Sequence, residues 1–255
     1  MDKQNSTTRF SDRVEDYKRY RPGYPAAIVP FLEQHYGFSA AEYSIADIGA
    51  GTGISSRLFL DHGYRVIGVE PNQEMRQAAI ADLQQFETFS IQDGTAEHTG
   101  LDDGSIDVLM AAQAFHWFDK AAVRKEFARI LKPEGLVILI WNERLIQSRF
   151  EQAYDELILR YAIDYVQVQH RNIEYADIKM FFAPGLCVQH EFTNQQIFDF
   201  EGLKGRLLSS SYMPKVGHQA YAAMIADLEQ LFEQYQESNT IQINYTTKIY
   251  IGRLR

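Results

Sequence analysis

Apolar runs and amphipathic stretches alternate along the chain between residues 43 and 142. The apolar runs predict strands near residues 43–48, 66–70, 89–93, 106–112 and 136–141. Runs such as 136–140 are continuously apolar, which is typical of strands covered on both faces. A helix is expected to begin at Asp119, a favoured N-cap residue, and to end before Pro133. The alternation predicts an α/β fold with a mostly parallel sheet and crossover helices.

The pattern changes after Asn142. Apolar side chains at steps of three and four predict a long amphipathic helix (Phe150, Tyr154, Leu157, Ile158, Tyr161, Tyr165). A strand is expected near residues 188–200 and a helix near 218–237. From Ile241 to Ile251 apolar and polar residues alternate, which predicts an antiparallel strand with two unlike faces. A single domain over residues 1–255 is therefore predicted, with an arm (1–30), a core (40–142), a helical insertion (143–187) and a segment that completes the sheet (188–255).

Three glycines follow the first predicted strand at alternate positions, Gly49, Gly51 and Gly53. They let the backbone pass close to a ligand. Glu70 ends the next predicted strand about 20 residues later, where an acid can accept hydrogen bonds from ribose hydroxyls. The third glycine of a dinucleotide fingerprint and the lysine of a phosphate loop are both missing. The pattern thus favours an adenosine-like cofactor other than a dinucleotide.

The sequence from Asp47 to Gly53, followed by Glu70, resembles motif I and the ribose acid of the class I S-adenosylmethionine-dependent methyltransferases. The resemblance implies a Rossmann-like seven-stranded, mostly parallel sheet with an antiparallel last strand, helices on both faces and a helical insertion after strand five. It implies S-adenosylmethionine as cofactor and S-adenosylhomocysteine as its product. The cofactor-binding residues that it implies are Asp47, Gly49, Ala50, Gly51, Gly53, Glu70, Pro71, Met75, Asp93, Gly94, Thr95 and Gln113. Among these, Asp93 is expected at the adenine amino group and Gln113 at the methionine part.

The expected acceptor side combines the segment after strand four with the N-terminal arm. His116, Trp117 and Phe118 follow strand four, and His116 is the candidate general base for a hydroxyl or carbon acceptor. The arm contributes Tyr17, Tyr20, Tyr24 and Arg21. The N-terminal arm, together with the segment Ala114–Asp119 after strand four, resembles those of a methyltransferase subgroup. This subgroup includes enzymes similar to trans-aconitate methyltransferase, which act on small organic acids.

Arg21 can bind a carboxylate of the cofactor or of the acceptor through a bidentate fork. Its alternative role is a surface ion pair with Asp12, Glu15 or Asp16. The insertion and the last helices are expected to shape the acceptor pocket (Tyr161, Tyr165, Phe181, Phe182, Tyr212).

Composition narrows the partners. The net charge of −9 disfavours nucleic acid, and no apolar run reaches the roughly 18 residues of a membrane span. The single cysteine, Cys187, excludes an intrachain disulfide, and the polar first residues lack a signal-peptide core. We therefore expect a cytoplasmic protein with a small-molecule partner and no metal.

The predicted reaction is an SN2 methyl transfer, with a carboxylate oxygen as the first choice of acceptor. Ubiquinone- and menaquinone-type C-methyltransferases share the core motifs, so C- or O-methylation of a quinone or phenol is an alternative. A non-catalytic S-adenosylmethionine-binding module is a second alternative, and a nicotinamide oxidoreductase is disfavoured by the missing third glycine.

Overall fold

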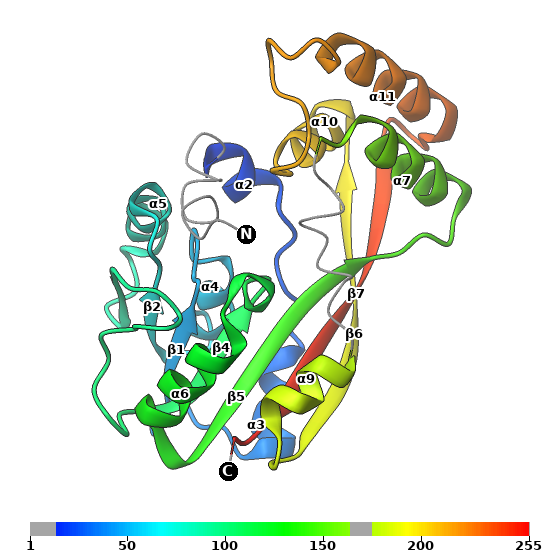
Figure 1. Ribbon diagram of the computed structural model, residues 1–255. Helices are drawn as coiled ribbons and strands as arrows, with labels where there is room; N and C mark the ends of the chain where they lie inside the picture. Colours follow the sequence, from blue (N-terminus) through cyan, green and yellow to red (C-terminus); the bar gives the residue numbers. More distant parts are fainter. Residues whose placement is uncertain (1–13, 164–174, 255) are drawn as a thin grey trace.

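A seven-stranded sheet forms the centre of the computed structural model, which describes residues 14–163 and 175–254 (Figure 1). The strand order is β3-β2-β1-β4-β5-β7-β6. The strands are β1 Ser44–Ile48, β2 Arg65–Val69, β3 Phe89–Gln92, β4 Ile106–Ala112, β5 Leu131–Arg144, β6 Cys187–Phe198 and β7 Ile241–Gly252. The first five are parallel, and β7 is antiparallel to both β5 and β6. The predicted fold class is confirmed.

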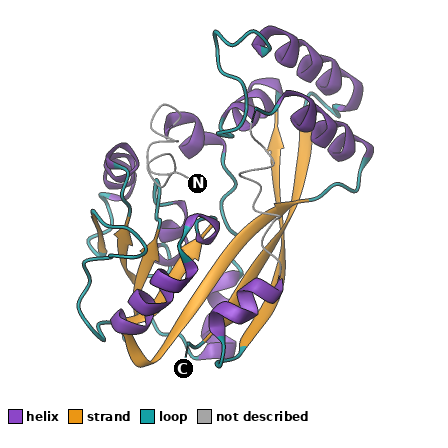
Figure 2. Cartoon of the chain, viewed as in Figure 1, coloured by secondary structure: helices purple, strands orange, loops and turns teal. Residues whose placement is uncertain are grey.

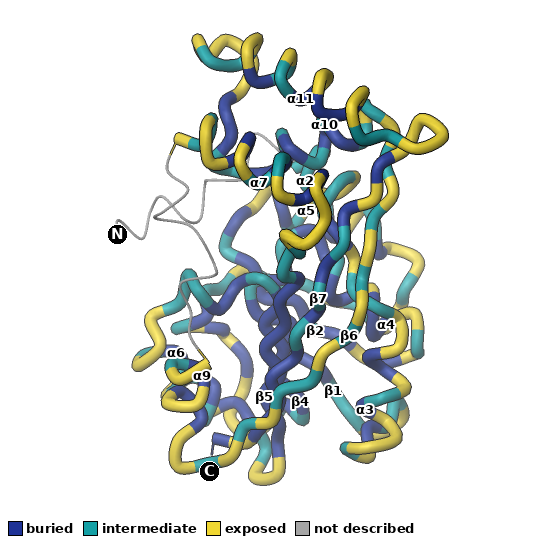
Figure 3. Tube along the Cα trace, turned by 90° about the vertical axis from the view of Figure 1, so that its right-hand side faces the viewer, coloured by how far each residue is buried: buried dark blue, intermediate teal, exposed yellow. Residues whose placement is uncertain are grey.

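Helices cover both faces of the sheet (Figure 2). The helices α3 Ile28–Tyr36 and α4 Ile54–Leu60 pack on one face, while α6 Lys120–Ile130 and α9 Tyr175–Phe182 pack on the other. Successive residues of the central strands alternate between these two cores, so that both faces of β4 and β5 are buried (Figure 3). This explains their continuous apolar runs. Asp119 caps α6 by accepting hydrogen bonds from two backbone N–H groups, as expected.

A separate cluster of helices forms a cap beyond one end of the parallel strands. It contains α7 Arg149–Tyr161, α10 Phe200–Leu208 and α11 Tyr221–Tyr235, which share a hydrophobic core with the start of β7. The long strands β5, β6 and β7 run past the shorter parallel strands and carry this cap (Figure 1). The arm helix α2 Val14–Tyr20 contacts both α10 and α5 Gln73–Leu83. The arm therefore bridges the cap and the core.

Two details differ from expectation. Strand β5 begins at Leu131 because Leu131 pairs with Ile106, and after a register shift its pairing with β4 resumes at Leu136. The expected insertion divides between two places, since α7 lies in the cap and α9 lies on the sheet. Phe181 and Phe182 of α9 are buried in the sheet core and not beside an acceptor pocket.

Residues 1–13 of the expected arm and residues 164–174 of the expected insertion, Tyr165 among them, lie outside the described residues. In the ranges 14–163 and 175–254, no helix combines the length and the apolar character that a membrane span requires.

Candidate active site

The glycine turn after β1 is tightly packed on two sides and open on the third. Gly49, Gly51 and Gly53 have φ of +74°, +57° and +84°, a left-handed region that favours glycine. A Cβ on Gly49 would lie 2.7 Å from Cβ of Ala114, and one on Gly53 would lie 2.5 Å from Cδ1 of Leu83. At Gly51 a Cβ would meet nothing within 4 Å. The turn therefore presents open space at Gly51.

The carboxylate of Glu70 faces this turn from the end of β2. It accepts a hydrogen bond from the backbone N–H of Gly51 at 3.0 Å and another from that of Asn72 at 2.9 Å. Burial raises the pKa of Glu70, although these two hydrogen bonds act to lower it. Asn72 in turn caps α5 by accepting from the backbone N–H of Met75. The acid is thus fixed between the turn and the helix start.

A cavity opens beside the turn, and we call it the turn cavity. The residues expected to bind the cofactor that line it are Gly49, Gly51, Glu70, Pro71, Met75, Thr95 and Gln113. The aromatic side chains of Tyr17, Trp117 and Phe118 also line it. The cavity combines a fixed carboxylate with apolar and aromatic surface and a backbone free of side chains at Gly51. These features fit an adenosine-containing ligand such as S-adenosylmethionine.

The described lining of the turn cavity does not include Asp47, Gly53, Asp93 or Gly94. Asp47 is fully buried under the turn and accepts hydrogen bonds from the hydroxyls of Ser55 and Ser56, each at 2.7 Å. Burial raises the pKa of Asp47 to about 6. Asp93 is exposed and pairs with Arg76 at 2.8 Å. Of these four residues, Asp47 lies buried beneath the turn, where its hydrogen bonds to Ser55 and Ser56 anchor the start of α4.

Gln113 has an unusual backbone conformation at the end of β4. Its φ of +56° is rare for a residue with a side chain and is held by two hydrogen bonds. The backbone N–H donates to the carbonyl of Ile140 at 2.9 Å, and Nε2 donates to the carbonyl of Asn142 at 3.1 Å. Backbone strain of this kind is often found at functional sites. Gln113 lines the turn cavity and also a second cavity beside it.

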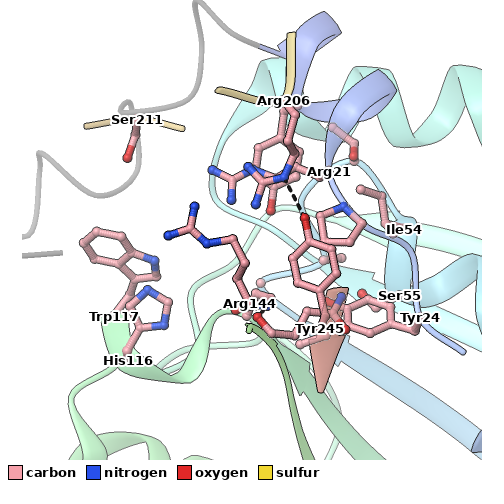
Figure 4. A pocket seen from close by; sticks show the side chains of 18 of the residues that line it. Arg21, Tyr24, Ile54, Ser55, His116, Trp117, Arg144, Arg206, Ser211 and Tyr245 are labelled. Atoms are coloured by element: carbon pink, nitrogen blue, oxygen red, sulfur yellow. Dashed lines mark hydrogen bonds between the residues drawn. The ribbon is translucent and has the colours of Figure 1, made fainter. Parts of the chain in front are cut away.

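We call the second cavity the arginine cavity. Three arginines from distant segments line it: Arg21 of the arm, Arg144 at the end of β5, and Arg206 of α10. Their guanidinium groups gather in one part of the cavity, above Tyr24 and Tyr245 (Figure 4). The two cavities share Tyr17, Gly49, Ala112, Gln113 and Trp117.

The three arginines have different partners. Arg206 donates from Nε to the hydroxyl of Tyr245 at 3.1 Å. Arg21 donates from Nη2 to the carbonyl of Ser209 at 3.0 Å and lies over the ring of Tyr17. Arg144 forms an ion pair with Asp155. Among the described residues, Arg21 forms no ion pair with Glu15 or Asp16, and Asp12, the other partner considered, lies outside them.

The predicted acceptor residues fall in several places. Tyr17 and Trp117 line both cavities, and Phe118 lines the turn cavity. Tyr24 and His116 line the arginine cavity. Ala50, expected to bind the cofactor, also lines the arginine cavity. Tyr20 lines neither among the described residues, because its ring packs against Gly205 of α10. The hydroxyl of Tyr161 donates a hydrogen bond to Asp227 on the cap, whereas Tyr212 lines the arginine cavity.

Sequence reasoning missed Arg144, Arg206 and Tyr245. Each lies in a segment without a recognised motif, and no local pattern marks them as members of one site.

Comparisons with known proteins agree with this geometry. The methyltransferase domain family matches residues 46–139. An uncharacterized methyltransferase of Mycobacterium bovis is 39% identical over 135 residues, which cover 53% of this chain and 52% of that protein. An uncharacterized methyltransferase-like protein of Schizosaccharomyces pombe is 25% identical over 254 residues, which cover 98% and 97% of the two chains. A solved structure from Anaeromyxobacter dehalogenans, assigned as a type II methyltransferase, has a TM-score of 0.67 at 20% identity, with 92% of this chain and 98% of that chain covered.

The sheet order and the structural likeness define a Rossmann-like methyltransferase fold. The region that matches the methyltransferase domain family, residues 46–139, contains both the glycine turn and Glu70. The aligned region spans about half the length of the Mycobacterium relative, 52%. The arm and the cap, which supply Arg21 and Arg206, lie outside the matched domain.

Proposed function

We propose that this protein transfers the methyl group of S-adenosylmethionine to a carboxylate oxygen of a small organic acid. The observation that carries the proposal is the arginine cavity, which adjoins the turn cavity and shares Gly49 and Gln113 with it. Guanidinium groups bind carboxylates through paired, charge-assisted hydrogen bonds. An acid bound there lies next to the part of the turn where the family resemblance places the methionine end of the cofactor.

The residues of the two cavities supply binding, orientation and exclusion of water. When bound, S-adenosylmethionine supplies a methyl group on a positively charged sulfur, and transfer to a carboxylate breaks the C–S bond, forms a C–O bond and moves no proton. Alignment of the acceptor can contribute about 7–11 kcal/mol to the lowering of such a barrier. Tyr17 and Trp117 stand where the cavities meet, and an aromatic face can attract a cation by about 0.5–2 kcal/mol. A carboxylate is already ionised near neutral pH, so it needs no general base.

Thermal unfolding with S-adenosylhomocysteine and, separately, with NADH tests the cofactor. A ligand at about 100 times its dissociation constant stabilises the folded state by about 2.7 kcal/mol. We expect this stabilisation with S-adenosylhomocysteine only, and a smaller one in Glu70→Ala. A response to NADH alone would favour the oxidoreductase instead.

The acceptor is tested with methyl-labelled S-adenosylmethionine and a panel of small carboxylic acids, quinones and phenols, with products identified by mass spectrometry. A labelled methyl ester that alkali hydrolyses supports the proposal. A labelled carbon–methyl bond or phenyl ether supports the quinone or phenol alternative. Binding of S-adenosylhomocysteine without any methylated product supports a non-catalytic binding module.

A further inference from the structure

The positive charge of the arginine cavity is not balanced by the residues around it. Its described lining contains three arginines and neither Asp nor Glu. Arg144 is neutralised by Asp155, and the two side chains are only 11% and 13% exposed. Within residues 14–163 and 175–254, no carboxylate contacts Arg21 or Arg206. Two uncompensated cations therefore face one cavity, in a chain whose net charge is −9.

Neutral groups hold these two guanidinium groups in place. Arg206 donates to the hydroxyls of Tyr245 and Ser210, at 3.1 and 3.3 Å. The Tyr245 hydroxyl donates onward to Oε1 of Gln196 at 2.9 Å, which fixes its orientation. Arg21 is held by the carbonyl of Ser209, and its buried Nε has no hydrogen-bond partner among the described residues. Each guanidinium has five N–H donors, so both retain donors for a ligand.

The two cations also oppose each other. Burial lowers the pKa of Arg21, and the positive charge of Arg206 lowers it further. Both groups nevertheless stay protonated, because arginine does not lose its proton at physiological pH. Cations brought together away from water without counter-charge destabilise the folded state. A ligand that carries the missing negative charges removes this cost.

We infer that the arginine cavity selects its acceptor by charge: it takes a small dicarboxylate, held jointly by Arg21 and Arg206, and releases the monoanionic methyl ester. The inference rests on the proposed function and adds the acceptor class and a reason for single methylation. Transfer of one methyl group turns one carboxylate into a neutral ester, so the product carries one negative charge fewer than the substrate. A charge-assisted hydrogen bond to a buried cation is lost with that charge. The ester should therefore bind about 10-fold more weakly or worse.

Calorimetric titration of the full-length protein at constant ionic strength, with and without S-adenosylhomocysteine, tests this inference. The probes are malonate, succinate and glutarate, each compared with its own monomethyl ester. We expect at least one diacid to bind about 10-fold more tightly than its monoester. In Arg206→Gln and in Arg21→Gln the diacid should lose most of that advantage, while the monoester changes little.

Arg160→Gln is the matched control, since Arg160 lies on the cap, is 65% exposed and pairs with Asp227 away from the cavity. It should leave the preference for the diacid unchanged. If Arg206→Gln fails to fold, Arg206→Lys serves in its place, and because it keeps the charge it should keep the preference.

Three results separate the inference from the proposed function. Equal affinity for every diacid and its monoester, or no binding of any diacid, overturns the inference. Methyl transfer to monocarboxylates as fast as to dicarboxylates also overturns it, and leaves the proposed function standing. Charge-selective binding without any methylated acid supports the inference about the site and overturns the proposed function.

Discussion

The turn cavity and the arginine cavity are neighbours, but the chain builds them in different ways. Most of the turn cavity comes from successive strand ends inside the methyltransferase domain, and its key acid, Glu70, is satisfied by backbone N–H groups. The arginine cavity joins the arm, the end of β5 and the cap, and leaves two cations unbalanced among the described residues. The first site is organised by the local chain, whereas the second depends on distant segments and on the charge of its ligand.

The largest expected effect is a loss of affinity for S-adenosylhomocysteine that follows a substitution in the turn cavity but not one in the arginine cavity. Glu70→Ala removes the carboxylate that faces the turn, and we expect the dissociation constant of S-adenosylhomocysteine to rise about 100-fold, because hydrogen bonds to charged groups contribute about 1.5–3 kcal/mol. Arg206→Gln is the comparable change in the other cavity, and it should alter this constant by no more than about twofold, as expected for independent sites. Calorimetric titration measures both. A similar loss in the two variants would mean that the cavities bind the cofactor together.

This contrast also explains what the sequence could predict. The bounds of β1, β2 and β4 and the cap at Asp119 agree with the structure to about one residue, because they depend on local apolar runs and a local capping preference. The turn cavity follows from glycines and an acid at fixed spacing. Arg206 carries no such signal, because its role appears only when α10 packs beside the arm. The sequence predicts Tyr20 on the acceptor side because nothing local distinguishes it from Tyr17. Only its contact with Gly205 in the folded chain does so.

The next effect tests whether docking of the arm builds the arginine cavity. A Cβ on Gly205 would overlap the ring of Tyr20, so Gly205→Ala should push α2 away from α10. Overpacking of this kind typically costs about 1–3 kcal/mol, so we expect kcat/KM for the acid acceptor to fall about 10-fold. The affinity for S-adenosylhomocysteine should change less. Methyl-transfer kinetics and the rate of tryptic cleavage after Lys18 and Arg19 measure the two consequences.

Gly23→Ala is the matched control in the same arm, because a Cβ there would meet nothing within 4 Å. It should leave both kinetics and cleavage unchanged. Tyr20→Ala combined with Gly205→Ala removes the overlap and should restore part of the lost activity. Full activity in Gly205→Ala alone would show that the arginine cavity does not need this contact.

A smaller effect concerns the buried support of the turn cavity. Burial raises the pKa of Asp47 from 3.8 to about 6, so the folded protein binds more protons than the unfolded chain between these values. The free energy of unfolding should therefore fall as pH rises through this range, by on the order of 1–3 kcal/mol relative to Asp47→Asn. Urea unfolding of both proteins from about pH 4 to pH 7 measures the difference. A difference that grows in favour of the wild type with rising pH would contradict the raised pKa.

The smallest expected effect decides whether the arginine cavity takes part in the chemistry or only binds. His116 lines this cavity, with its ring 4.8 Å from that of Trp117. For a carboxylate acceptor, His116→Ala should change kcat by less than about threefold, because the acceptor is ionised without help near neutral pH. For a hydroxyl or carbon acceptor a general base is required, and its loss should lower kcat about 100-fold or more. The pH profile of kcat distinguishes a base from a residue that only packs, since only a base leaves a limb near its own pKa. A flat pH profile with an unchanged kcat would mean that the arginine cavity binds the acceptor and selects it by charge, without a general base. Methyl transfer would then depend on alignment of the acceptor with the cofactor bound in the turn cavity.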